Sequence, residues 1–173
     1  MAEKRVVLSI GLLASNRKDT IKKCLDSLQS IREVIPCQLI ITDTGCDADL
    51  RITLEQYADT INEFTWCTDF AKARNANLSQ AVGEWYLYLD DDEWFVDTEE
   101  LIDFFKSGAY KKFEGACYVQ HNYQNMEGTL YSDDYVSRMI RLTEDTHFVG
   151  KIHEYLVPVP QKNCLLNSWV DHY

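Results

Sequence analysis

In the first part of the chain, continuous runs of hydrophobic residues alternate with segments in which hydrophobic residues recur every three or four positions. Residues 6–13 form a short run of aliphatic residues, which is typical of a strand buried on both faces of a parallel sheet. Apolar residues then recur every three or four positions over 21–31, which predicts an amphipathic helix. A second apolar run at 38–42 and a helical pattern over 50–57 repeat this order, so the chain begins as alternating strands and helices.

The same order continues through the middle of the chain. The pattern predicts a strand near 61–66 and a helix from Asp69 to Ala81, with Gly83 as a left-handed C-terminal residue. A strand follows at 84–89. The next segment predicts a helix that starts at Asp97 or Thr98 and stops at Gly108.

Beyond Gly115 three further segments, at 117–123, 135–142 and 153–159, have strand patterns without helices between them. Strands that alternate with helices favour a mostly parallel sheet with helices on both faces, and ligands of such sheets bind at the carboxyl ends of the strands. The function is therefore expected at residues 14–17, 43–47 and 90–93.

The segment 90–93 places three aspartates and a glutamate directly after an apolar strand. Carboxylates at this density repel one another unless a cation offsets them. An Asp-x-Asp pair that also leaves room for water and phosphate oxygens is typical of Mg²⁺ or Mn²⁺ on a diphosphate. The alternative is a solvated acidic loop that caps the following helix.

The turn after the first strand, residues 14–17, has neither a glycine-rich nor a Walker sequence. A diphosphate bound here would therefore depend on a metal rather than on a glycine cradle. The turn also lacks the aspartate nucleophile of a phosphoaspartate phosphatase.

Length and charge narrow the function classes. The 173 residues fit one domain, and the formal net charge of −11 repels a nucleic-acid backbone or an anionic membrane. The six cysteines show no zinc-ligand spacing and are expected to be reduced, mostly buried thiols. We expect neither a cleaved leader nor a membrane span, and hence a cytoplasmic protein.

Several motifs taken together resemble family 2 glycosyltransferases, especially bacterial members with a DDDEW-type signature. They are SNR after the first strand, LIITDTG, DFAKARNANLSQAVGEW, YLYLDDDEW, SRMIRL and FVGKIHEYL. The resemblance covers residues 6–157. It implies the GT-A fold, a Rossmann-like α/β nucleotide-diphospho-sugar transferase fold, and an inverting transfer that depends on Mn or Mg.

The resemblance also implies roles for single residues. The residues implied to bind the nucleotide sugar are Ala14, Ser15, Asn16, Asp43, Arg74, Asp90 and Asp91. Among them, Asp43 matches the aspartate that binds the base and favours uracil, and Arg74 matches an arginine of the nucleotide pocket. Asp92 matches the principal metal ligand, with Asp90 beside it. Alone, Asp43 is also typical of a helix-preceding cap, and Arg74 of a surface ion pair with Asp69 or Glu84.

Inverting transfer needs a carboxylate that takes the proton of the acceptor. Glu154 is our candidate for this base, since it lies in an HE segment similar to one in this subgroup. Asp133 or Asp134 is the alternative. The alternative without a catalytic role is that Glu154 lies on the polar face of a strand.

His172 corresponds to a histidine that reaches the metal or the diphosphate in related enzymes. The His-Tyr-Gly-Tyr pattern of the family stops here after two residues, which leaves open whether residues 1–173 are one complete catalytic domain or one truncated at its C-terminus. Arg138 and Arg141 are expected either to support the diphosphate or to form a solvent-facing pair.

Two tryptophans flank the acidic loop. Trp85 is expected in the core, and Trp94 is a candidate contact for a sugar or acceptor.

The sequence thus predicts a metal-dependent transfer from a nucleotide diphosphate sugar, most simply a UDP-sugar, to a glycan, lipid, peptide or protein. Two alternatives stay open. One is a nucleotidyltransferase that uses the same acidic loop, and the other is a module that binds nucleotide or metal without turnover.

Overall fold

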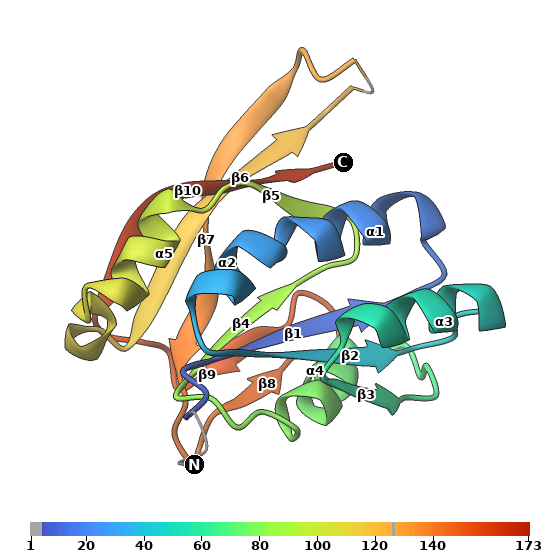
Figure 1. Ribbon diagram of the computed structural model, residues 1–173, viewed down its shortest axis with the longest axis horizontal. Helices are drawn as coiled ribbons and strands as arrows, with labels where there is room; N and C mark the ends of the chain where they lie inside the picture. Colours follow the sequence, from blue (N-terminus) through green and yellow to red (C-terminus); the bar gives the residue numbers. More distant parts are fainter. Residues whose placement is uncertain (1–4, 126) are drawn as a thin grey trace.

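Eight strands of the computed structural model form one twisted sheet, in the order β3-β2-β1-β4-β7-β6-β10-β5 (Figure 1). The structure describes residues 5–125 and 127–173. In that sheet the strands are β1 (Leu8–Ala14), β2 (Cys37–Asp43), β3 (Thr60–Glu63), β4 (Trp85–Leu89), β5 (Glu93–Asp97), β6 (Gly115–Tyr123), β7 (Tyr131–Arg141) and β10 (Asn163–His172). A separate ribbon pairs β8 (His147–Val149) with β9 (Tyr155–Val157).

The helices follow the order that the sequence predicts. They are α1 (Lys18–Ser27), α2 (Gln29–Val34), α3 (Ala48–Tyr57), α4 (Phe70–Leu78), α5 (Glu99–Lys106) and a short 3₁₀ helix η1 (Ala109–Lys112). The longest of these have ten residues, so no helix in the described parts of the chain is long enough to cross a bilayer.

The sheet is mostly parallel, as the sequence predicts. The four strands β3, β2, β1 and β4 run parallel, and β10 runs parallel to β6. The pairs β4–β7, β6–β7 and β5–β10 are antiparallel. The carboxyl ends of β1, β2 and β4 therefore meet at one edge, where ligands of such sheets bind.

The alternating side chains of β4 belong to two different cores. Trp85, Leu87 and Leu89 pack into the larger core, which lies under α1, α2, α3 and α5. Tyr86 and Tyr88 face the opposite side and pack in a smaller core with residues of α4 and the β8–β9 ribbon. Helices thus cover both faces of the sheet (Figure 1), and β4 is buried on both, as expected for a parallel strand.

A buried amide fixes α4 against the sheet. Asn77 Nδ2 donates to the carbonyls of Leu12 and Ile40, and its Oδ1 accepts from the Tyr86 hydroxyl at 2.7 Å. Gly11 makes this contact possible, because a Cβ there would lie 2.0 Å from the Tyr86 hydroxyl oxygen. The close approach of helix and sheet positions the N-terminus of α4 near the ligand-binding edge.

Several sequence-based boundaries need correction. Helix α4 ends at Leu78, and Gly83 does not adopt the left-handed conformation, because it serves a tight approach to the backbone of Ser9 instead. Asp69 does cap α4, accepting from Lys72 N, and Gly108, the predicted stop of the next helix, lies two residues beyond the end of α5 in the left-handed conformation. The sequence analysis did not predict β5, β8 or β10.

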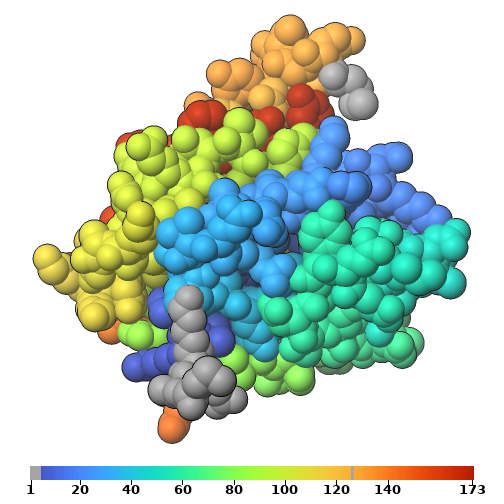
Figure 2. Space-filling model, in the orientation of Figure 1, coloured from blue at the N-terminus to red at the C-terminus, as the bar shows by residue number. Residues whose placement is uncertain are grey.

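The hairpin of β6 and β7 projects beyond the body of the molecule (Figure 2).

All six cysteines are free thiols. Cys24 and Cys117 are buried, three are half-buried and Cys67 is exposed. Burial raises the pKa of Cys37 and of Cys46 to about 12, so neither thiol is an activated nucleophile.

Candidate nucleotide and metal site

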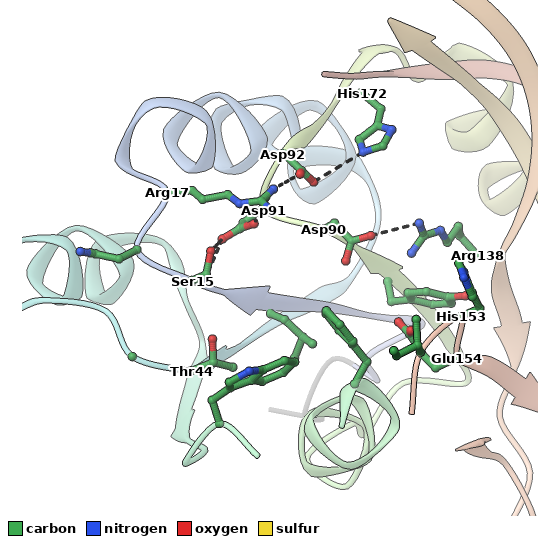
Figure 3. Close-up of a pocket in the computed structure, with 17 residues that line it drawn as sticks. Ser15, Arg17, Thr44, Asp90, Asp91, Asp92, Arg138, His153, Glu154 and His172 are labelled. Atoms are coloured by element: carbon green, nitrogen blue, oxygen red, sulfur yellow. Dashed lines mark hydrogen bonds and ion pairs between the residues drawn. The ribbon is translucent and has the colours of Figure 1, made fainter. Parts of the chain in front are cut away.

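A cavity of about 720 Å³ opens at the carboxyl ends of β1, β2 and β4 (Figure 3). It is bordered by the turn after β1, the turn after β2 and the acidic loop after β4, where the sequence predicts the ligand site. Its lining consists of Leu13, Ser15, Asn16, Arg17, Thr44, Gly45, Trp66, Phe70, Tyr88, Asp90, Asp91, Asp92, Arg138, Ile152, His153, Glu154 and His172.

Asp90 is neutralised by two arginines, of which Arg74 is buried and Arg138 is half-buried. Arg74 Nη2 donates to Asp90 Oδ1, and Arg138 Nη2 lies 3.1 Å from Asp90 Oδ2. Both guanidinium groups also lie over the Tyr88 ring, at 4.9 and 4.7 Å from its centroid. Burial acts to raise the pKa of Asp90, but the two arginines outweigh it and hold that pKa far below its usual value.

Arg74 also bonds the candidate base. Its Nε donates to Glu154 Oε1 at 3.1 Å, and its Nη1 donates to the carbonyl of Leu89 at 2.9 Å. Only 1% of the Arg74 side chain is exposed. The surface ion pair with Asp69 or Glu84 is therefore the wrong interpretation of Arg74, which is buried behind the cavity and is not one of the residues that line it.

A buried glutamate supports Arg138 from behind. Glu93 Oε1 accepts from Arg138 Nη2 at 3.0 Å and from Gln120 Nε2 at 2.5 Å. Burial raises the pKa of Glu93. The residue ties the acidic loop to β6 and β7 and helps to hold Arg138 beside Asp90.

The other two aspartates of the loop bond the turn after β1. Asp91 Oδ2 accepts from Ser15 N and Ser15 Oγ, both at 2.7 Å. Arg17 pairs with Asp92 Oδ2 and lies 3.7 Å from Asp91 Oδ1. The loop is thus neutralised by guanidinium groups from three different segments, not only by a cation from solution as the sequence analysis supposed.

Asp92 also faces His172, whose Nε2 lies 3.9 Å from Asp92 Oδ1. Burial lowers the pKa of His172, so the imidazole is neutral at pH 7. One carboxylate and one imidazole suit Mn²⁺ or Mg²⁺ when phosphate oxygens and water supply the remaining ligands. The ion pairs in and behind the cavity lining involve three arginines and five carboxylates: Arg17, Arg74 and Arg138 with Asp90, Asp91, Asp92, Glu93 and Glu154. With every group ionised, the carboxylates exceed the arginines by two negative charges, which one divalent cation offsets.

Within residues 5–125 and 127–173, no group of three or more histidine, cysteine, aspartate or glutamate side chains is arranged to hold a metal. The Asp92–His172 pair therefore supplies only two protein ligands, and water or the oxygens of a bound diphosphate would complete the coordination of a cation. Both oxygens of Asp90 are bonded to arginines, so its assignment as a metal ligand stays a prediction.

Asp43 and Ala14 do not border the cavity. Asp43 Oδ1 accepts from the backbone of Gly45 and Cys46, and its Oδ2 accepts from Arg51 Nη1 at 2.9 Å. The carbonyl of Ala14 accepts from Thr44. Both residues shape the turns that follow their strands, whereas Ser15, Asn16, Thr44 and Gly45 line the cavity.

An aromatic rim lies opposite the acidic loop. Trp66 and Phe70 pack edge to face at 4.8 Å between centroids and are 40% and 38% exposed. The backbone joins this rim to the segment before β9, since Phe70 N donates to the carbonyl of Lys151. The left-handed residues Thr68 and His153 lie in these two segments, which places backbone strain at the edge of the cavity.

The sequence analysis did not assign the rim a function. The available signal was a pair of aromatic residues on either side of a helix cap, with Trp66 before Asp69 and Phe70 after it.

Other candidates lie elsewhere. Asp133 and Asp134, the alternatives for the base, are on the exposed part of β7 and do not line the cavity. Arg141 donates to the carbonyl of Tyr110 instead of joining Arg138, because residues three apart on a strand point to opposite faces. Trp85 is fully buried as predicted, and Trp94 stacks on Tyr173 outside the cavity lining.

Several known proteins are similar to this chain. The model of the family described as glycosyl transferase family 2 matches residues 9–154. The SPbeta prophage-derived glycosyltransferase SunS of Bacillus subtilis (strain 168) is 29% identical over 154 residues, which are 85% of this chain and 34% of that protein. The chain thus spans about a third of the length of the curated relatives it matches.

Solved structures share the fold. S. aureus TarS 1–349 in complex with UDP-GlcNAc superimposes with a TM-score of 0.57 at 19% identity, covering 69% of this chain and 36% of that one. The mannosyltransferase PcManGT from Pyrobaculum calidifontis, in complex with GDP-Man and Mn²⁺, gives a TM-score of 0.53 at 19% identity, covering 68% and 36%. The fold is therefore the one that the sequence motifs imply.

Proposed function

The chain belongs to glycosyl transferase family 2, and from that premise we propose that it transfers a sugar from a nucleotide diphosphate sugar to an acceptor, with inversion at the anomeric carbon. The observation that carries the proposal is the placement of Glu154 across one cavity from Asp92 and His172 (Figure 3). A group that accepts a proton and a pair that suits a diphosphate-bound cation thus border the same space.

Asp92 and His172 are the residues that would hold the metal, with Mn²⁺ or Mg²⁺ as the ion. When bound, such an ion offsets the charge that develops on the leaving diphosphate. Arg17 and Arg138 also line the cavity and add positive charge to the binding of the donor. This local charge is needed because the whole chain carries a net charge of −11.

The chemical step exchanges one bond to the anomeric carbon for another. The acceptor hydroxyl oxygen bonds to that carbon while the bond from the carbon to the diphosphate oxygen breaks, and the nucleoside diphosphate leaves. The hydroxyl proton passes to Glu154. Its Oε1 already accepts from Arg74, and among the described residues no group bonds Oε2, which is therefore the atom that takes the proton.

UDP is the first nucleotide to test. Asp43 supports this choice less than the motifs imply, because its oxygens serve the turn after β2. The stronger support is the shared fold of TarS, whose structure contains UDP-GlcNAc. GDP is the matched comparison, because PcManGT of the same fold binds GDP-Man.

The test is a panel of melting temperatures with UDP, GDP, CDP and dTDP, each with Mn²⁺ and with EDTA, followed by product analysis by mass spectrometry with UDP-GlcNAc. We expect UDP to raise the melting temperature only with Mn²⁺, because ligand binding to the folded state is linked to stability. Release of free sugar and UDP supports the proposal. Pyrophosphate release would identify nucleotidyl transfer, and binding without product would identify a binding module.

A further inference from the structure

Asn122 lies beside His172 on neighbouring parallel strands, with the two residues directly paired between β6 and β10. Asn122 Oδ1 is 2.9 Å from His172 Nδ1. At its other end, Asn122 Nδ2 donates to Asp134 Oδ2 on β7 at 3.0 Å. A chain of hydrogen bonds thus runs from an exposed carboxylate on the outer part of the hairpin to the imidazole at the cavity.

The carboxylate decides which way the amide points. An ionised carboxylate only accepts hydrogen bonds, so the NH₂ group of Asn122 must face Asp134. The opposite orientation would put the amide oxygen against a negatively charged oxygen. Asp134 therefore turns the carbonyl of Asn122 toward His172.

The amide carbonyl in turn decides where the imidazole carries its proton. A carbonyl oxygen accepts and never donates, so His172 Nδ1 must be the protonated nitrogen. In a neutral imidazole the lone pair then belongs to Nε2, the atom that faces Asp92 Oδ1 at 3.9 Å. Two electron-pair donors face each other across that gap, which is within the roughly 4 Å that two ligand atoms of one Mg²⁺ or Mn²⁺ can span.

We propose that Asn122, oriented by Asp134, is a positioning residue that holds His172 as the Nδ1–H tautomer and presents the Nε2 lone pair beside Asp92 as a ligand for a divalent cation. The role of the cation rests on the proposed function. The tautomer itself does not, because it follows from hydrogen bonds within the chain.

The tautomer is measured directly by long-range ¹H–¹⁵N NMR of histidine-labelled protein without metal, at pH 8.5. The chain has four histidines, so His172→Gln assigns the signals of His172. We expect the native protein to show His172 protonated at Nδ1. In Asn122→Leu the acceptor is lost and Asp92 attracts the proton, so the signals should change to the Nε2–H form.

Asp134→Asn tests the hydrogen bond between Asp134 and Asn122. Asp134 is exposed, so we expect this substitution to leave the fold intact. An asparagine at this position both donates and accepts, so it no longer forces the amide of Asn122 and His172 should show a mixture of tautomers. Asp133→Asn is the matched control, because it removes the same charge one residue away but contacts His121. It should leave the signals of His172 unchanged.

Binding of Mn²⁺ alone, followed by electron paramagnetic resonance, gives the second measurement. Asn122→Leu should weaken Mn²⁺ binding by about 10- to 100-fold, as loss of the partner of a metal-bound histidine does, while Asp133→Asn retains it. A native His172 protonated at Nε2, or an unchanged tautomer in both Asn122→Leu and Asp134→Asn, overturns the proposal. Failure of Mn²⁺ to bind a protein that has the Nδ1–H tautomer overturns the role of the cation and leaves the tautomer established.

Discussion

Arg74 Nε donates to Glu154 Oε1 at 3.1 Å although the two residues are 80 positions apart in the chain. The pair joins α4 to the segment before β9, and Arg74 extends it to Asp90 at the end of β4. One interior guanidinium group therefore orders both the candidate base and the acidic loop.

Arg74→Met should destabilise the protein strongly. It removes the buried partner that Asp90 and Glu154 share, and breaking an interior charge pair typically costs about 3–5 kcal/mol. Arg51→Met is the matched control, because Arg51 pairs with three carboxylates but has a side chain that is 26% exposed. Its loss should cost about 1 kcal/mol or less. Urea unfolding measures both, and equal losses would contradict the interior role of Arg74.

Glu154→Gln should lower turnover by about 10²- to 10⁴-fold while UDP affinity stays nearly unchanged, because the amide cannot take a proton. The amide oxygen still accepts from Arg74, so the wall of the cavity keeps its shape. Glu84→Gln, on a carboxylate that pairs with Arg5 away from the cavity, is the control. Full turnover of Glu154→Gln at saturating donor would reassign the base.

Asp92→Asn and Asp91→Asn should separate binding from stability. Loss of a metal ligand at Asp92 should weaken Mn²⁺-dependent UDP binding about tenfold or more. Asp91 is buried and bonds Ser15 twice, so Asp91→Asn should cost about 1–2 kcal/mol of apo stability. Calorimetry of UDP-Mn²⁺ binding and urea unfolding of the apo proteins distinguish the two. Normal UDP-Mn²⁺ binding by Asp92→Asn would make the acidic loop structural.

Arg17→Gln should strengthen the binding of Mn²⁺ alone, because Arg17 pairs with Asp92 and competes with the ion for it. The gain should be severalfold in dilute buffer and smaller at high ionic strength, where charges on exposed side chains are screened. Lys18→Gln is the control, since Lys18 pairs with Asp47 instead. Titration of Mn²⁺ by electron paramagnetic resonance measures the affinities, and weaker binding by Arg17→Gln would mean that Arg17 assists the ion.

The low pKa of Asp90 predicts a loss of stability in acid. Between pH 5 and 7 the carboxyl group is ionised in both the folded and the unfolded chain, and its contribution to stability is fully present. Below about pH 4 the unfolded chain takes up a proton that the folded chain refuses, so stability falls by at most about 1.4 kcal/mol per pH unit from this group. Asp90→Asn should show a shallower decrease in urea unfolding between pH 4 and 3, and an equal decrease would contradict the assignment.

The sequence predicted those helices and strands whose hydrophobic pattern is typical of their structure. Strands β1, β2 and β4 were found because parallel strands buried on both faces read as continuous apolar runs. Strand β5 was missed because its five residues follow the acidic cluster without a break, and β10 because its alternation of small, polar and aromatic residues is irregular. Neither strand has a hydrophobic pattern that distinguishes it from the residues on either side.

The sequence named several residues that line the cavity but not how they pair. Arg74, Glu154, Asp92 and His172 were named from motifs, yet nothing in the sequence shows that Arg74 bonds Glu154 or that Arg17 pairs with Asp92. These contacts join segments that only the sheet brings together. Asp133 and Asp134 were offered as bases for the same reason, because sequence alone does not show how far the hairpin projects.

The position of β10 between β6 and β5 bears on how the protein is made. A chain that folds as it leaves the ribosome can complete β1, β2 and β4 early, since their pairing needs only residues up to about 90. The edges of β5 and β6 must wait for residues 163–172, and Asp92 gains His172 only at that moment. A nascent chain thus exposes two unpaired strand edges until residues 163–172 have emerged, and only then does the cavity have both of its sides.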